Sequence, residues 1–274
     1  MTLIAASHGT DNSDGAKAIA SLVTKVNEVL SGPDLANSTR VLEAFVDVQQ
    51  PDVPTVLAGV ESATIVPLLL ATGYHVRQDI ADAAFARAQE LDAGHEVRIS
   101  PALGPDQRLV DVLVQRLNEA GYQSDDLVIL TVAGSSDIRA QAETNKVKAM
   151  LEASLGHEVE LAFLSAAEPK LKDLVPKLKF QNPRKRIVIS TYLLAPGFFS
   201  GLLQSVGAHV VAKPLLSPDL ATPQQLIDIV VERYKDAQSR EGQTGCLDGL
   251  NGRPFEGCAA GCLTSCQIGR ASCR

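Results

Sequence analysis

The second half of the chain repeats the first. Three apolar segments of the first half recur in the same order in the second. The pairs are LIAASHG at 3–9 with LVILTVAG at 127–134, VLEAFVDVQQP at 41–51 with VELAFLSAAEP at 159–169, and LLLATGYH at 68–75 with YLLAPGFF at 192–199. Matches in one fixed order indicate an internal duplication. We therefore expect two domains of the same fold, residues 1–120 and residues 121–239, followed by a Gly- and Cys-rich tail over residues 240–274.

Each half alternates short apolar runs with helical patterns. In the first half, the runs at 3–6, 41–48 and 64–70 are rich in Val, Ile and Leu, and an amphipathic pattern covers 15–30. Apolar strands separated by amphipathic helices are typical of a parallel sheet that is covered on both faces. The expected fold class is therefore α/β, with two tandem-repeat α/β/α domains. We expect the last helix over 223–239.

Composition narrows the class of function. The 274 residues carry a formal net charge of −7, and Lys and Arg cluster only over 182–186, whereas nucleic-acid binding needs many clustered cations. No apolar run reaches the roughly 18 residues that span a bilayer, and residues 1–6 lack the basic region and cleavage site of a secretory leader. We expect a cytoplasmic protein that binds neither nucleic acid nor a membrane and is a monomer or a homodimer.

The two halves differ in their polar residues. His8, Asp47 and His75 of the first half stand where the second half has Ala, Ser and Phe. In open α/β sheets, ligands bind beyond the carboxyl ends of the strands, and all three residues lie at such ends. Strand alternation puts Glu43 on the same face as Asp47, so either carboxylate is a candidate acid. We expect these side chains to converge in one site.

Two imidazoles and a carboxylate form a site suited to divalent iron, cobalt, nickel or zinc. The same groups accept protons, since His is the usual base near neutral pH. Metal insertion into a tetrapyrrole needs both properties, because the ion must shed water and the ring must lose two N–H protons. A single His after a strand is as often a hydrogen-bonded turn residue. The loss of both histidines from the second half favours a functional pair, His8 and His75.

The motifs around these residues resemble those of the class II chelatases, the sirohydrochlorin chelatases of siroheme and cobalamin synthesis. The first half carries ASHGT at 6–10, AFVDVQQP at 44–51 and VPLLLATGYHVRQDI at 66–80. In the second half, AGSSD at 133–137 and LLAPGFF at 193–199 resemble the degenerate copy of the long, two-repeat form found in actinobacteria. The resemblance extends over about residues 1–235.

The resemblance implies an enzyme that inserts a divalent metal, Fe²⁺ first of all, into sirohydrochlorin, with the two domains facing a central cleft. It implies that His8 and His75 bind the metal and accept the pyrrole protons. The family's acidic residue falls on Asp47, where the family usually has Glu, and Glu43 is the alternative acid. The peripheral carboxylates of the substrate need cationic and hydrogen-bonding partners. The residues placed for that role are Thr10, Arg77, Ser135, Ser136 and Arg139.

The tail offers a separate candidate site. Its candidate ligands are Cys246, Cys258, Cys262 and Cys266. The last three are separated by regular intervals of three residues, so the four thiolates could hold an iron–sulfur cluster or a zinc ion. A flexible tail without a cluster is the alternative. Residues 267–274 resemble the translation of a sequencing-library adapter, and Cys273 is therefore left out of the candidate ligands.

Several other functions compete with iron insertion. The same ligands accept cobalt, so cobalt insertion into sirohydrochlorin for cobalamin synthesis is one alternative. A non-catalytic carrier of the tetrapyrrole or the metal is another. A dinucleotide-binding enzyme is disfavoured because no strand is followed by G-x-G-x-x-G, and a serine hydrolase because the chain lacks a G-x-S-x-G elbow.

Overall fold

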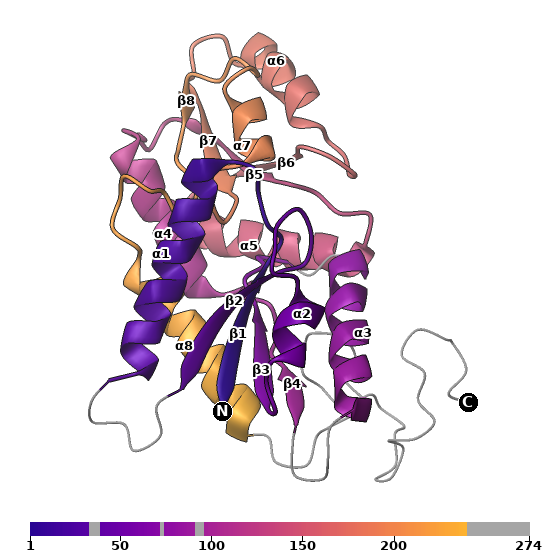
Figure 1. Ribbon diagram of the computed structural model, residues 1–274. Helices are drawn as coiled ribbons and strands as arrows, with labels where there is room; N and C mark the ends of the chain where they lie inside the picture. Colours follow the sequence, from indigo (N-terminus) through magenta and orange to yellow (C-terminus); the bar gives the residue numbers. More distant parts are fainter. Residues whose placement is uncertain (33–38, 72–73, 91–95, 240–274) are drawn as a thin grey trace. The chain divides into compact units, whose positions relative to one another are not determined.

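The computed structural model describes residues 1–32, 39–71, 74–90 and 96–239, and for residues 74–77 it describes the backbone alone. The chain forms two compact units, which are described separately (Figure 1). The first unit consists of Met1–Gly9, Val23–Leu103 and the chain from Asp228 onward, and the second consists of Thr10–Leu22 and Gly104–Ile227. The cysteine tail lies outside the described residues.

The first unit is built on a parallel sheet with the strand order β2-β1-β3-β4. The strands are β1 (Thr2–Ser7), β2 (Arg40–Phe45), β3 (Ala63–Pro67) and β4 (Val97–Ile99). Along the chain they are connected by helices α1 (Ser13–Leu30), α2 (Val53–Ala58) and α3 (Tyr74–Glu90). Strand β1 is central, since Ala6 pairs with Ala44 on one side and with Pro67 on the other.

The second unit repeats this sheet with the order β6-β5-β7-β8, again with every pair parallel. The strands are β5 (Leu127–Val132), β6 (Glu160–Phe163), β7 (Ile187–Tyr192) and β8 (Val210–Val211). The connecting helices are α5 (Ile138–Leu155), α6 (Leu171–Gln181) and α7 (Phe198–Leu203). The α/β fold class is therefore confirmed, and the identical strand order agrees with the duplication.

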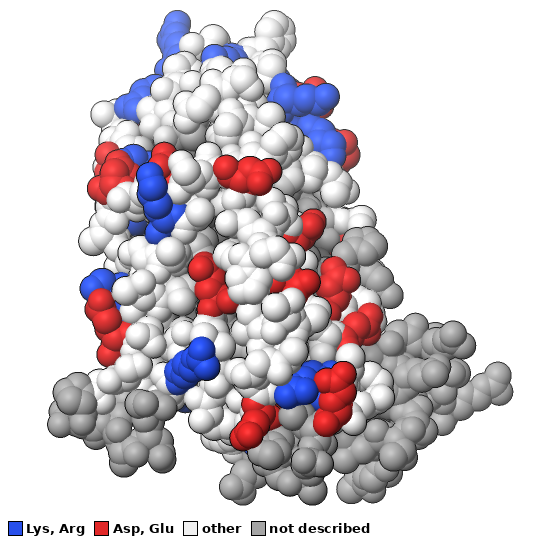
Figure 2. All heavy atoms as spheres, in the orientation of Figure 1, with Lys and Arg blue, Asp and Glu red and all other residues white. Residues whose placement is uncertain are grey.

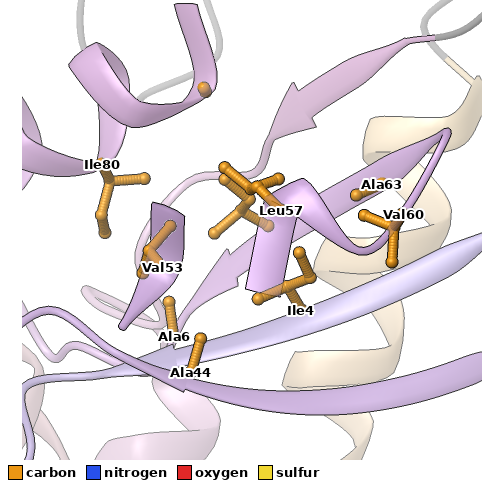
Figure 3. Packing of buried hydrophobic residues seen from close by; sticks show 10 residues of the cluster. Ile4, Ala6, Ala44, Val53, Leu57, Val60, Ala63 and Ile80 are labelled. Carbon is orange, nitrogen blue, oxygen red and sulfur yellow. The ribbon is translucent and has the colours of Figure 1, made fainter. Parts of the chain in front are cut away.

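Small and branched apolar residues fill the space between the first sheet and helices α2 and α3 (Figure 3). Ile4, Ala6 and Ala44 from the strands pack with Leu57 of α2 and Ile80 of α3, and each of the five is at most 1% exposed. Full burial of a Leu or Ile side chain stabilises a fold by about 2 kcal/mol. The second unit has an equivalent cluster between its sheet and helices α6 and α7.

The last helix of each half packs in the unit that the other half forms. Helix α4 (Gln107–Glu119) belongs to the second unit, where it contacts α5 and β7. There Arg116, which is 2% exposed, donates to the Leu215 carbonyl at 2.9 Å. Helix α8 (Gln224–Ser239), which confirms the helix expected over 223–239, lies mostly in the first unit. There Gln238 Nε2 donates to Thr64 Oγ1 at 2.7 Å.

The compact units therefore differ from the expected domains, residues 1–120 and 121–239. Those domains would keep every helix with the sheet of its own half, whereas α4 and α8 each join the opposite unit. Helix α1 is divided, because its residues up to Leu22 group with the second unit and those from Val23 with the first. An amphipathic helix buries its apolar face equally well on either of two similar sheets, so the sequence pattern does not distinguish them.

Strand β2 is shorter than its apolar run. The run over 41–48 predicts one strand, but β2 ends at Phe45, and residues 46–50 form a turn. Within that turn, Val48 has a φ of +67°. A residue in this left-handed region cannot continue a strand.

Charges of both signs are interspersed on the face of the molecule that Figure 2 shows. On α1, Lys17 pairs with Asp14 and Lys25 pairs with Glu28, all with exposed side chains. Such exposed pairs contribute little to stability individually. None of the helices in the described part of the chain has the length and apolar character needed to cross a membrane.

Candidate active site

His8 and Asp47 are neighbours just beyond the ends of β1 and β2. The contact between the two strands continues past their last residues, since the Val46 amide donates to the Ser7 carbonyl at 2.8 Å and the Asp47 amide donates to the His8 carbonyl at 3.1 Å. His8 and Asp47 are both exposed at this carboxyl edge of the sheet. The structure therefore brings two of the predicted site residues together through their backbones.

A tight turn holds the carboxylate of Asp47. The Gln49 amide donates to the Asp47 carbonyl at 2.7 Å, so the chain reverses at Val48. The Val48 amide also donates to Asp47 Oδ1 at 2.7 Å. A left-handed conformation at a β-branched residue costs about 1–3 kcal/mol, and it persists only where the surrounding structure compensates for it. The turn therefore orients Asp47 at an energetic cost to the backbone.

Gly9 permits the close approach of the two strand ends. Its φ is +88°, and a Cβ atom on it would fall well inside 3.0 Å of the Asp47 carbonyl oxygen, a separation that real Cβ atoms essentially never show. Any other residue at position 9 would push the His8 segment away from Asp47. The sequence analysis did not single out Gly9, although its recurrence as Gly134 in the second half was a usable signal.

His75 belongs to the same edge by its backbone position. It is the second residue of α3, which follows β3, and β3 pairs directly with β1. The side chains of His75 and Arg77 lie outside the described part of the structure. Their roles therefore stay predictions.

Glu43 does not reach this edge in the way that strand alternation predicts. It lies within β2 and pairs with Ala5, three residues before His8, which is about 10 Å along a strand. The expectation that Glu43 and Asp47 share a strand face is wrong, because β2 ends at Phe45 and Asp47 is in the turn. Glu43 is half-buried, and this burial raises the pKa of its carboxyl group.

The second repeat keeps the turn but has different side chains on it. The Ser165 amide donates to the Ala133 carbonyl at 2.8 Å, as Asp47 does to His8, and the Ala167 amide closes the turn on the Ser165 carbonyl at 2.6 Å. Ala166 has a φ of +54°, and Gly134 has a φ of +101° with its Cα close to the Ser165 carbonyl. One backbone arrangement therefore occurs twice, with a potential metal ligand or base only in the first repeat.

Four of the predicted substrate-binding residues lie in the second unit. Thr10 Oγ1 accepts a hydrogen bond from the Asn12 amide at 3.1 Å. Between β5 and α5, Ser135 Oγ accepts from the Asp137 amide at 3.1 Å, and Ser136 is exposed. Arg139, whose side chain is 54% exposed, pairs with Asp137 at 3.4 Å. The two serines and Arg139 thus gather at the carboxyl end of β5, the position that His8 takes at β1.

A hollow in the first unit lies at the other end of the strands. Its lining consists of Met1, Thr2, Arg40 and residues 59–62, at the starts of β1, β2 and β3. Ligands of open α/β sheets bind at the carboxyl ends instead. The hollow is therefore not part of the candidate site.

The CbiX family model matches the chain twice, over residues 2–120 and 127–237. The chain belongs to the CbiX family. A sirohydrochlorin ferrochelatase of Priestia megaterium is 33% identical over 150 residues, which are 54% of this chain and 54% of that protein. A sirohydrochlorin ferrochelatase of Bacillus subtilis is 27% identical over 171 residues, 59% of this chain and 62% of that protein. The chain thus matches little more than half the length of these relatives.

Two solved structures share the fold. SirB from Bacillus subtilis with Fe³⁺ has a TM-score of 0.72 at 21% identity, covering 88% of this chain and 97% of that one. CbiX, described as the terminal enzyme of siroheme biosynthesis in denitrifying bacteria, has a TM-score of 0.56 at 14% identity, covering 86% of this chain and 99% of that one. At these identities, the likeness shows the fold alone.

In this CbiX-family chain, the described part of the site supplies one imidazole and one carboxylate. Among the residues that the structure describes, no three His, Cys, Asp or Glu side chains gather as a metal site. The side chain of His75, the predicted third group, and the four tail cysteines fall outside the described part of the structure. Imidazole and carboxylate are both groups that bind divalent ions and accept protons.

Proposed function

We propose that this protein inserts Fe²⁺ into sirohydrochlorin. The observation that carries the proposal is the asymmetry between two matched turns. Both repeats keep the same backbone hydrogen bonds, but His8 and Asp47 occur in the first where Ala133 and Ser165 occur in the second. The two relatives named sirohydrochlorin ferrochelatase support this substrate and this metal.

The reaction exchanges two protons of the macrocycle for one metal ion. The hydrated ion must lose water, and imidazole nitrogens at His8 and His75 are suited to replace it. As the metal enters the ring, two pyrrole N–H groups lose their protons, and neutral imidazole is a suitable acceptor near neutral pH. A divalent cation enters and two protons leave, so the net charge of the macrocycle does not change.

Asp47 is proposed as the acid that assists a histidine. A carboxylate beside an imidazole favours the imidazole's protonated form and fixes its orientation. Asp47 is one atom shorter than the Glu that is usual in the family, and its turn brings its backbone within hydrogen-bonding distance of the His8 backbone. Glu43, within β2, is the less favoured acid because of its distance along the strand.

The substrate's carboxylates need partners beyond the metal ligands. We assign this role to five residues, of which the two arginines provide charge and the three hydroxyl residues provide hydrogen bonds. They are Thr10, Arg77, Ser135, Ser136 and Arg139. We further propose that the enzyme works in the cytoplasm as a monomer or a homodimer.

The test is a metal-insertion assay under anaerobic conditions. Sirohydrochlorin is mixed with Fe(II), Co(II) or Ni(II), and the absorbance change on metallation is followed with and without the protein. We expect the wild type to accelerate insertion of Fe(II) over the metal-only control. His8→Ala and His75→Ala should each lose about 100-fold or more of kcat, the usual range for removal of a general base. Asp47→Asn should lose about 10-fold.

The matched controls are His157→Gln and Ser165→Ala, both in the second unit. His157 is bonded to the Tyr122 hydroxyl, and Ser165 donates to the Ala133 carbonyl at 2.8 Å. Both variants should keep kcat within about twofold of the wild-type value if the first repeat alone carries the chemistry. Faster insertion of Co(II) than Fe(II) would assign the protein to cobalt instead. Binding of sirohydrochlorin without any acceleration would show a carrier and refute the proposed enzyme.

A further inference from the structure

Val48, which directly follows the candidate acid Asp47, has an unfavourable backbone conformation. Its φ is +67°, and among the described residues other than glycine only Ala166 also has a positive φ. The left-handed region is uncommon for any side chain and most unfavourable for a β-branched one. Backbone strain of this kind is concentrated at ligand-binding and catalytic sites.

The side chain of Val48 gains little from the fold. It is 51% exposed, although valine is among the residues most often fully buried. The turn uses the backbone of this residue, since its amide donates to Asp47 Oδ1 at 2.7 Å. Every residue except proline has such an amide, and asparagine adopts the left-handed region more readily than valine does. Neither burial nor the turn therefore accounts for a valine at this position.

The second repeat shows that the same turn forms without a valine. The Ala167 amide closes the turn on the Ser165 carbonyl at 2.6 Å, as the Gln49 amide does on the Asp47 carbonyl at 2.7 Å. Between these two residues stands Ala166, with a φ of +54°. The larger, branched side chain therefore occurs only in the repeat that has the candidate metal-binding and proton-accepting groups.

Val48 lies at the edge of the first sheet that carries the candidate site. His8, Asp47 and Val48 all belong to the first unit, and the Asp47 amide donates to the His8 carbonyl at 3.1 Å. Imidazole and carboxylate groups serve the metal and the protons, but they offer no apolar surface to a flat macrocycle. Sites for organic ligands are mostly apolar, with a few polar groups that fix the orientation of the ligand. An exposed isopropyl group beside His8 and Asp47 meets that requirement.

We propose that Val48 is a substrate-binding residue, whose isopropyl group packs against the face of the tetrapyrrole macrocycle. The turn holds this side chain in solvent at the expense of its own stability, and the bound macrocycle then covers it. The contact is to the ring itself and adds to the partners of the peripheral carboxylates. The inference rests on the proposed function for the identity of the ligand.

The main test is Val48→Asn, which keeps the backbone amide, suits the left-handed conformation and removes the apolar contact. Sirohydrochlorin is titrated without metal and its absorbance is followed. We expect its Kd to rise about 5-fold or more, as for the loss of a partly buried valine side chain. The KM for sirohydrochlorin should rise equally, while kcat for Fe(II) insertion stays within about threefold. Equal Kd values in Val48→Asn and the wild type would overturn the proposal.

The matched control is Val29→Asn. Val29, in α1, is 47% exposed and belongs to the same unit, so this variant removes an equally exposed valine outside the turn. It should keep the wild-type Kd for sirohydrochlorin. A rise in Kd as large as that of Val48→Asn would show a general effect of lost apolar surface and contradict the proposal.

Val48→Leu restores an apolar side chain and should bind sirohydrochlorin within about threefold of the wild-type Kd. If it loses as much affinity as Val48→Asn, an apolar contact is not what Val48 supplies, and the proposal is wrong.

Thermal stability should not fall with macrocycle affinity. Val48→Asn relieves backbone strain, so it should melt at the wild-type temperature or a few degrees above it. Melting more than about 2 °C below the wild type would assign Val48 to the fold and overturn the proposal. Methyl NMR of the wild type needs no stable variant. The Val48 methyl signals should shift when sirohydrochlorin is added without metal, those of Val29 should not, and an absent Val48 shift would contradict the contact.

The two readouts, macrocycle binding and metal insertion, separate this inference from the proposed function. If the wild type binds sirohydrochlorin without accelerating insertion, the proposed enzyme fails, but weaker binding by Val48→Asn still supports the contact. If the wild type accelerates insertion and Val48→Asn binds the macrocycle equally well, the proposed function stands and the contact is wrong.

Discussion

At the scale of single residues, two glycines in the left-handed region make the two matched turns possible. Gly9 and Gly134 have φ values of +88° and +101°, and each brings its Cα close to a carbonyl oxygen of the neighbouring turn. Two effects disfavour any other residue at each position: the strain of a left-handed backbone and the steric clash of a Cβ atom. Their separate contributions to the free energy of unfolding can be measured.

Gly9→Ala should destabilise the protein more than Gly121→Ala. Gly121 has a φ of +79° but no atom within 4 Å of an added Cβ, so its variant faces only the conformational cost of about 1–2 kcal/mol. Gly9→Ala faces the same cost plus a clash with the Asp47 carbonyl, and we expect at least twice the loss. Urea unfolding of both variants measures the difference. Equal losses of unfolding free energy in the two variants would mean that the turn shifts to accommodate the methyl group.

Glu43→Gln should stabilise the protein at neutral pH and not in acid. Burial raises the pKa of Glu43 above its ordinary value of 4.5, so the folded protein binds this proton more tightly than the unfolded chain. The stability that Glu43 contributes is fully present below pH 4.5 and is lost as the pH rises through the raised pKa.

Thermal melting from pH 4 to 8 tests this expectation for Glu43. The difference in melting temperature between Glu43→Gln and the wild type should increase with pH across that range. Glu160→Gln, at an exposed position on β6, corrects for the general effect of removing one carboxylate. A constant difference between Glu43→Gln and the wild type at every pH would contradict the prediction.

Much of the backbone of the candidate site could be predicted from the sequence, because a residue that follows an apolar strand can be recognised from its neighbours in the chain. The strand ends before His8 and the edge that it shares with Asp47 are confirmed by the backbone. The turn at Val48 could not be predicted, since an apolar β-branched residue favours a strand, whereas here Val48 has a φ of +67° and the turn is closed by hydrogen bonds to Asp47. That turn also invalidates the alternation that linked Glu43 to Asp47.

At the scale of elements, the end of α8 depends on the first sheet. Arg98 of β4, with a side chain 17% exposed, donates to the Gln238 carbonyl at 2.7 Å and the Ala237 carbonyl at 3.4 Å. The last carbonyls of a helix have no partner within it. A cationic donor from another element therefore caps α8 and ties it to the first unit.

Arg98→Ala should cost about 2 kcal/mol of stability, within the usual range for hydrogen bonds from charged donors. The control is Lys25→Ala, which removes an exposed cation paired with Glu28 and should cost at most about 1 kcal/mol. Urea unfolding of the two variants compares them. A loss for Arg98→Ala no larger than that for Lys25→Ala would show that the Arg98 hydrogen bonds contribute little to holding α8.

The helices themselves were predictable, but their partners were not. The helical pattern over residues 223–239 gives α8 its place in the chain. Which sheet each helix covers depends on contacts between residues far apart in sequence, such as Arg116 with Leu215 and Gln238 with Thr64. Because the two sheets are similar, a periodic pattern contains no information about that choice.

At the scale of the whole molecule, the second repeat retains the backbone of the turn that carries His8 and Asp47 in the first repeat. Installing His at Ala133 and Phe199 and Asp at Ser165 should therefore create a second binding site for Co(II). We expect the bound Co(II) per chain to double at saturation, as measured by equilibrium dialysis. Phe199 packs partly against the second core, so the variant should also melt at a lower temperature.

The control for this triple variant adds His8→Ala and His75→Ala. Only the installed site then remains, and Co(II) binding should persist at half the stoichiometry of the triple variant. An unchanged stoichiometry in the folded triple variant would mean that the matched turns do not suffice to place a metal ligand set.

Helix α4 comes from the first half but packs in the second unit, and helix α8 comes from the second half but lies mostly in the first unit. This arrangement limits which parts of the gene can be deleted. Each half supplies a helix without which the other half's sheet loses part of its cover, so neither half can be deleted once the two are joined. Mutations can still remove the reactive side chains from one half. A duplicated gene of this kind can exchange polar residues in one half while selection for folding preserves its length, and in the present chain Ala133 and Ser165 stand where the first half has His8 and Asp47.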